Sequence, residues 1–514
     1  MAYDRPGVYV QETLNPTAPA TGLNSDTVGA FVGPNDRGPI IPTLVTSWSD
    51  YVTKFGSWNT TASNDLPLAV YMFFANGGRQ AYVLRVVGAG AAAAARTIQD
   101  RAGSPNNTLT LTAVDPGAWS VNSGSYYGIS FSITDSVKTG YFDLTVYFGG
   151  ITAPYIVEKF TDLSMTTTDA RYAISVINAG SRYVVATDAG SPSTGATRNP
   201  ALVSVGSGSL TGGLNGSALT SITNFSAFDV IKTSLLLNVA GWTDATTVNA
   251  AISYAQTRTD VFVIVDGLAP TNGSESVATT TTNQLAAAAA YTASAYAAVY
   301  YPRLTISDPT VGVGGATGAT KLVGPGGAVA GLYVATDNFR GVFKAPAGLQ
   351  TRVANAVSVV ALTNAQLDSL NSATAPVNAI KYVPGSGIVV MGARTLNPSY
   401  IDRYVPVRRT LIYLEKALSD LTQFAIFEPN NATLWRRINS TVSSFLTNFW
   451  AQGGLRGTTP TQAFFVKVDS TNNTPATIDN GEVHIEIGVA LQRPAEFVVI
   501  KIGQFDGGTT VTVA

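Results

Sequence analysis

The sequence predicts a multidomain protein of mixed α/β and α+β class: a mixed α/β middle domain, an inserted β-sandwich or barrel domain, an α+β C-terminal domain, and extended strand arms at both termini. Three patterns support this prediction. Strand and helix patterns alternate in residues 28–87 and again in 211–343, as in a sheet covered by helices. Short alternating strands in residues 88–210 are typical of a β-sandwich or barrel. Residues 344–494 combine two long helical patterns with strands near their end.

Composition limits the classes of function. A chain of 514 residues suggests about three domains. Only 12% of the residues are charged, against about 25% in a typical soluble domain, and the net charge is -1. The chain therefore has no overall field that would attract nucleic acid or an anionic membrane, and near-neutrality favours self-association. The absence of cysteine excludes disulfides, thiolate metal sites and cysteine nucleophiles.

Residues 1–27 indicate an N-terminal arm followed by a linker. Apolar and polar residues alternate in a short candidate strand bracketed by Pro6 and Pro16. Its residues are Val8, Tyr9, Val10, Gln11 and Glu12. The Pro-, Thr- and Ala-rich run that follows lacks periodicity, as an extended linker does. No basic region with a following apolar run opens the sequence, so we expect no signal peptide and folding in a cytoplasm.

The middle domain is predicted from buried-strand and helix signals. Helical segments are expected around Leu66–Phe74 and Asp244–Arg258, and a buried strand over residues 260–267. Residues 285–302 are rich in alanine and are interrupted by polar residues. A membrane span needs about 20 strongly apolar residues, so a buried helix is favoured there.

Residues 405–457 predict a helix, a short strand and a second helix. The first helix should end near Thr422 and carry one apolar stripe. That stripe comprises Leu411, Leu414, Leu418 and Leu421. The sequence FAIFE predicts a strand that Pro429 ends, and Asn430 or Asn431 can cap the second helix, which should stop at Gly453. The second stripe comprises Leu434, Ile438, Val442, Phe445 and Phe449.

Candidate catalytic chemistry is sparse, and we predict no catalytic, cofactor or metal site. His484 is the only histidine, and it alternates with Glu482 and Glu486 on what should be a solvated strand face. The glycine-rich stretches, including 324–331, match neither G-x-G-x-x-G nor a P-loop, so turns and close backbone approach explain them better. Asp266 ends a buried strand, where α/β enzymes place catalytic groups, but without a His or Cys partner a capping or turn role is favoured.

The region from 405 to 457 also carries a family resemblance. VRRTLIYLEKAL, QFAIFEPNNATLWRRI and SSFLTNFWAQGGLRG resemble the C-terminal domain of the sheath protein of contractile phage tails and related injection machines. Further blocks resemble family landmarks in the expected order. They are PGVYVQE (6–12), YYPRLTISDP (300–309), AVAGLYVATDNFRGVFKAPAG (328–348), GIVVMGARTL (387–396) and GEVHIEIGVALQRPAEFVVIKI (481–502). Several ordered blocks are more specific than one short motif.

The resemblance implies a structural, non-enzymatic sheath subunit. Such a subunit forms stacked hexameric rings around an inner tail tube and contracts to drive the tube through a cell envelope. Its implied partners are neighbouring sheath subunits, the tube protein, and baseplate and tail terminator proteins, without direct nucleic-acid contact or stable membrane insertion. The implied location is a virion tail assembled in the host cytoplasm. A sheath from a non-phage injection system or a bacteriocin remains open. A cytoplasmic α/β hydrolase is disfavoured by the missing histidine set, and a surface-layer protein or adhesin by the missing signal peptide.

The resemblance further implies that terminal arms join a sheet in neighbouring subunits by strand addition. The C-terminal arm is expected over residues 495–514. Its subunit-linking residues are Glu496, Phe497, Val498, Val499 and Ile500. The pairs Arg408–Arg409 and Arg436–Arg437 are either ordinary helix-surface charge or contacts with a partner, and we expect Arg436 and Arg437 to face the tube.

Overall fold

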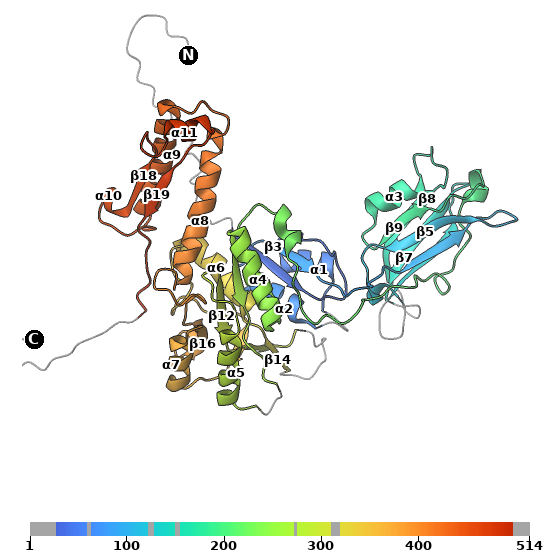
Figure 1. The fold of residues 1–514 in the computed structure, drawn as a ribbon. Helices are drawn as coiled ribbons and strands as arrows, with labels where there is room; N and C mark the ends of the chain where they lie inside the picture. The colour runs from blue at the N-terminus through green and yellow to red at the C-terminus, as the bar shows by residue number, and fades with distance from the viewer. Residues whose placement is uncertain are drawn as a thin grey trace, which may run out of the picture.

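The computed structural model describes residues 27–58, 63–121, 128–149, 155–271, 275–309 and 319–496. Figure 1 shows a central body of helices and strands, a β-rich domain joined to it by a narrow neck, and a helical C-terminal part at the top. The predicted N-terminal strand and the predicted arm residues Phe497 to Ile500 lie outside the described residues.

The centre of the molecule is an eight-stranded sheet with the order β17-β16-β12-β11-β10-β1-β3-β2. Its strands are β1 (Val28–Gly33), β2 (Thr43–Val45), β3 (Ala81–Arg85), β10 (Leu235–Val239), β11 (Val261–Val265), β12 (Ala297–Tyr301), β16 (Val377–Val383) and β17 (Gly387–Val390). The inner strands pair in parallel, and β2 and β17 close the two sides antiparallel. Strands β1, β10, β11 and β12 are buried at every position, because parallel sheets are covered on both faces.

Helices cover both faces of this sheet. On one face lie α1 (Trp48–Phe55), α2 (Asp65–Ala75) and α6 (Gly326–Arg340); on the other lie α4 (Ala245–Arg258), α5 (Val277–Ala289) and α7 (Asn364–Ser372). The helices predicted around residues 66–74 and 244–258 and the strand over 260–267 are therefore confirmed. The single helix expected over 285–302 is wrong, because α5 ends at Ala289 and the aromatic run that follows forms β12.

Helix α6 lies directly against α2. A Cβ atom on Gly327 would stand 2.1 Å from the carbonyl oxygen of Ala69, and one on Gly331 would stand 2.5 Å from that of Phe73. Only glycine allows this approach, so the prediction that these glycines serve close backbone packing is confirmed. Beside this pair lies a small sheet of β13 (Leu304–Ser307), β14 (Thr320–Val323) and β15 (Ala356–Val359).

The β-rich domain contains two three-stranded antiparallel sheets around one apolar core. One sheet has β4 (Ala95–Gln99), β5 (Asn107–Ala113) and β9 (Val184–Asp188); the other has β6 (Ile129–Asp135), β7 (Phe142–Phe148) and β8 (Tyr155–Leu163), with α3 (Ala173–Gly180) beside them. At the neck the Gly88 N–H donates to Asn215 O at 3.2 Å and the Ser217 N–H donates to Ala89 O at 3.0 Å. The two connecting segments therefore run side by side.

The C-terminal part consists of α8 (Val405–Thr422), α9 (Ala432–Ala451), α10 (Pro460–Ala463), β18 (Phe464–Lys467), α11 (Pro475–Asp479) and β19 (Glu486–Val489). The first half of α8 packs in the central body through Val405 and Ile412, and its second half contributes Leu414 and Leu418 to a separate C-terminal core. Of the predicted α8 stripe only Leu414 is fully buried. The side chain of Asn431 caps α9, as predicted.

The strand predicted from FAIFE is wrong. Residues 423–425 form a short 3-10 turn, and Phe427 has a left-handed φ of 64°. Alternation of apolar residues predicts a strand only where another strand pairs with it, and Pro429 confines this segment to a turn. As a result Ile426 and Phe427 are exposed at the α8–α9 connection.

Candidate functional site

Asp266 caps a helix at the carboxyl edge of the central sheet, which is where α/β proteins commonly bind ligands. Its carboxylate accepts the N–H of Gly241 at 3.0 Å and that of Gly326, the first residue of α6, at 2.6 Å. The side chain is buried, and burial raises the pKa of the carboxyl while Arg303 opposes that rise. The predicted capping role is confirmed. The carboxylate occupies the place at the α6 N-terminus where an anionic ligand would otherwise bind.

His484 lies on an exposed face. Its Nε2 is 3.0 Å from Oε2 of Glu482, and both side chains are about half exposed. The prediction of a solvated face is confirmed, since Glu486 is exposed as well. Among the described residues no group of three or more carboxylates and histidines could hold a metal ion. No described helix combines the length and apolar character that crossing a membrane requires.

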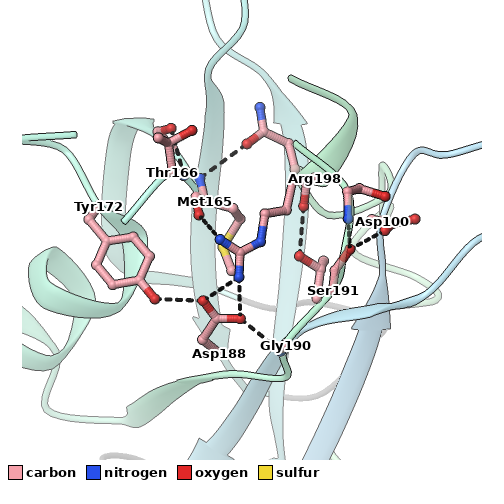
Figure 2. Close-up of polar contacts among 12 residues, drawn as sticks. Asp100, Met165, Thr166, Tyr172, Asp188, Gly190, Ser191 and Arg198 are labelled. Carbon is pink, nitrogen blue, oxygen red and sulfur yellow. Dashed lines mark hydrogen bonds and ion pairs between the residues drawn. The ribbon is translucent and has the colours of Figure 1, made fainter. Parts of the chain in front are cut away.

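Hydrogen bonds and an ion pair join a cluster of polar side chains in the β-rich domain (Figure 2), although Arg198 Nε is buried without a hydrogen-bond partner. Arg198 Nη2 is 2.8 Å from Oδ2 of Asp188, which also accepts the Tyr172 hydroxyl at 2.7 Å. Close by, Ser191 donates to Asp100, and this bond holds the pKa of the Asp100 carboxyl down at about 2. These bonds fasten the segment that follows β9 onto the sheet. Because Arg198 pairs with Asp188 and Asp100 accepts the Ser191 hydroxyl, the cluster stabilises the fold of this domain.

Arg409 forms a buried ion pair, so the expectation that the Arg408–Arg409 pair is surface charge or a partner contact is wrong for this residue. Its Nη1 donates to Oδ1 of Asp337 on α6 at 2.9 Å, and the side chains are 3% and 1% exposed. The guanidinium carbon also lies 4.7 Å from the ring centroid of Tyr333. Burial, the largest single influence, acts to lower the pKa of Arg409, but the charge and hydrogen bond of Asp337 together with Tyr333 and Tyr300 raise it overall. The pair joins α8 to α6.

Arg408 makes contacts within the chain too. Its Nη2 is 3.0 Å from Glu415 Oε1, and its guanidinium carbon lies 4.3 Å from the ring centroid of Tyr296. The first Arg-Arg pair therefore fixes α8 to the body and does not present free charge to another molecule.

Arg436 and Arg437 are exposed on α9, in agreement with a role at the surface. Arg437 lies over the ring of Phe424, 4.3 Å from its centroid, and Arg436 donates to Thr433 Oγ1 at 3.4 Å. They adjoin the turn that exposes Ile426 and Phe427. This apolar turn was not predicted from the sequence, although Pro429 followed by two asparagines is a turn signal.

Strands β18 and β19 form a sheet of two antiparallel strands with which α9 packs. Among the described residues neither strand pairs with a third one, although Asn439 Nδ2 of α9 donates to Val466 O of β18 at 3.2 Å and the Arg456 N–H donates to Ala490 O, just after β19, at 2.7 Å. A two-stranded sheet is marginal alone, and open edges can accept further strands.

Glu496 is the one predicted subunit-linking residue of the C-terminal arm that lies within the described part of the chain. It does not project from the molecule. Its Oε2 is 2.7 Å from Nη2 of Arg394 and accepts the Tyr404 hydroxyl at 3.0 Å.

These observations describe a mixed α/β multidomain protein whose described C-terminal part carries a two-stranded sheet and an exposed arginine pair on α9. Residues 401–504 match the family described as the phage tail sheath C-terminal domain, which confirms the resemblance seen in the sequence. This match covers α8, α9 and the β18–β19 sheet.

Known proteins with related sequence are tail sheath proteins. The tail sheath protein of Vibrio phage KVP40 is 30% identical over 179 residues, which are 34% of this chain and 25% of the relative. The chain thus spans about a quarter of the length of the curated relatives it matches. Both relatives are named tail sheath proteins.

Solved sheath structures share the fold along nearly the whole chain. The contracted helical sheath of the anti-feeding prophage gives a TM-score of 0.56 at 21% identity, covering 98% of this chain and 100% of the other. The sheath tail protein from Listeria innocua gives 0.59 at 13% identity, covering 91% and 95%. The mixed α/β multidomain architecture is therefore that of sheath proteins.

Proposed function

We propose that this chain is the subunit of a contractile tail sheath, which polymerises as stacked hexameric rings around an inner tail tube. Contraction would drive the tube through the target envelope, with interface energy and not a catalysed reaction supplying the work. The observation that carries the proposal is the sheath C-terminal domain match over residues 401–504. The full-length likeness to a contracted sheath supports it.

The particle is either a phage tail or a related injection system. Sequence relatives are phage proteins, whereas the sheath of the anti-feeding prophage matches over the whole chain. Another structure of that system is described as its baseplate, which supports a baseplate as a partner here. The tube and a tail terminator complete the proposed set of partners.

The proposed link between subunits is strand addition. An N-terminal strand containing residues 8–12 and a C-terminal strand containing residues 497–500 would pair with the outer edges of β18 and β19 in neighbouring copies. Such a contact joins two different surfaces and therefore propagates as a ring or helix.

Electron microscopy of the purified protein tests the function directly. Long tubular polymers, or rings that stack, are expected at high protein concentration. A protein that stays monomeric at all concentrations, both alone and with its tube, would contradict the proposal.

We further propose that the β-rich domain faces outward and is dispensable for assembly. Because the two neck segments lie side by side, residues 89–216 can be replaced by a short Gly/Ser linker between Gly88 and Ser217 without separating their ends. The shortened chain is expected to keep a cooperative unfolding transition and to form tubes of smaller outer diameter in electron micrographs. A folded product that forms no tubes would place the domain within the lattice.

Arg436 and Arg437 are proposed to face acidic or polar groups of the tube. Exchanging both for glutamate should reduce cosedimentation with the tube several-fold at low salt, while sheath self-association persists, since rim charges mainly alter encounter rate and salt dependence. The control is Arg79→Glu with Arg182→Glu, an equal charge change at exposed sites away from α9. Equal tube binding by both double variants across a salt series would refute this orientation.

A further inference from the structure

Glu496 is held at the base of the C-terminal arm by two side chains from the segment between β17 and α8. The bonds to Arg394 and Tyr404 are 2.7 Å and 3.0 Å long. The side chains of Arg394 and Glu496 are only 11% and 21% exposed. This contact spans 102 residues of sequence, and it fixes the chain at the point after which residues 497–514 follow.

Arg394 is itself bonded to the central sheet. Its backbone N–H donates to Oδ1 of Asn378 at 2.7 Å, and its carbonyl oxygen accepts Nδ2 of the same side chain at 2.8 Å. Asn378 lies in β16, is 2% exposed, and also donates to the carbonyl oxygen of Val299 in β12 at 3.1 Å. A side-chain donor of Arg394 reaches Asn371 O in α7 at 2.6 Å. Glu496 is therefore connected through Arg394 and Asn378 to two neighbouring strands.

The segment that leads to Glu496 lines a groove. Gln492 is still attached to the C-terminal part, because its Nε2 donates to Leu455 O at 3.0 Å. Residues 492–496 then form one wall of a groove of about 500 Å³, whose other lining residues include Phe343 and Met391. The segment leaves the β18–β19 sheet at Gln492 and is fixed again on the body at Glu496.

We propose that Glu496 anchors the base of the C-terminal arm to the central sheet, with Arg394 and Tyr404 as positioning residues. This inference rests on the proposed function, in which the arm binds a neighbouring copy. A pull on the arm is then carried by β16 and β12 of the body. The β18–β19 sheet, which precedes the arm in sequence, does not transmit this force.

The test uses the full chain with Glu496→Ala, Glu496→Gln and the charge swap Arg394→Glu with Glu496→Arg. The matched control is Glu482→Ala, which removes an exposed carboxylate paired with His484 in the same terminal region. Because Arg394 keeps its bonds to Asn371 and Asn378 when Glu496 is removed, the unfolding temperature of Glu496→Ala should fall by less than about 2 °C. The critical concentration for assembly, measured by sedimentation, should rise about tenfold, equal to ~1.4 kcal/mol per subunit. The swap should recover most of this loss.

Hydrogen exchange of the unassembled protein provides a second readout that does not depend on polymer formation. Glu496→Ala should speed exchange of the amides between residues 491 and 496 by about tenfold, with β19 unchanged. If both the critical concentration and the exchange equal those of the Glu482→Ala control, the anchor is refuted. An unaltered chain that forms no polymer would overturn the proposed function, and the exchange result would then decide the anchor alone.

Discussion

Deleting Met1–Glu12 is expected to abolish assembly while leaving the unfolding temperature of the monomer nearly unchanged. The strand predicted in the deleted segment precedes a Pro-rich linker, so its backbone hydrogen bonds should be made with a neighbouring copy. Each such bond contributes about 0.5 to 1.5 kcal/mol net, and the loss recurs at every subunit of the lattice. Sedimentation and electron microscopy measure assembly, and thermal unfolding measures the fold.

A full-length control distinguishes the effect of losing the strand from the effect of shortening the chain. Replacing Val8 and Val10 by proline keeps the length but removes two N–H donors and any regular ladder, so it should also prevent assembly. If the truncated chain still forms normal contractile sheaths, strand exchange by the N-terminal arm has to be abandoned.

Replacing Arg409 by methionine is expected to lower the free energy of unfolding by about 3 to 5 kcal/mol. The change leaves the Asp337 carboxylate buried without its partner, and an unpaired buried charge is strongly destabilising. The double variant Arg409→Met with Asp337→Leu should recover a large part of that loss, because it removes both charges. The shift of the urea unfolding midpoint measures the effect.

The control for this prediction is Lys416→Met on the same helix. Lys416 pairs with Asp420 at 2.7 Å, but both side chains are well exposed, so at most about 0.5 kcal/mol should be lost. Equal losses for Arg409→Met and Lys416→Met would mean that the buried pair does not join α8 to α6 energetically.

Features encoded by neighbouring residues were predictable from the sequence. Asn431 and Gly453 delimit α9 because capping and left-handed termination depend on local residues alone. The buried strand β11 followed from an uninterrupted apolar run. The β-rich insertion was recognisable from short alternating strands.

Features that depend on distant partners were not predictable. Arg409 looks like surface charge in the sequence because its partner, Asp337, lies 72 residues away. The hydrogen bonds of Glu496 were unpredictable for the same reason, since no residue near position 496 indicates that Arg394 is its partner. Strands β16 and β17 lie within residues 344–494, which were predicted to form the C-terminal domain. They nevertheless complete the sheet of the preceding domain, because sheet order is set by long-range packing. The FAIFE turn is the converse case: a strand pattern without a described partner strand.

Helix α8 has a mechanical consequence for the whole subunit. Its 18 residues span about 27 Å and pass without interruption from the core of the body into the core of the C-terminal part (Figure 1). Beyond Pro406 the helix contains neither proline nor glycine, the usual sites of a kink. A force that rotates the β18–β19 sheet is therefore transmitted to the central sheet through the rigid helix α8, which Arg409 holds to the body. When a sheath changes its pitch, we therefore expect each subunit to rotate as one rigid body, with bending confined to segments outside this helix.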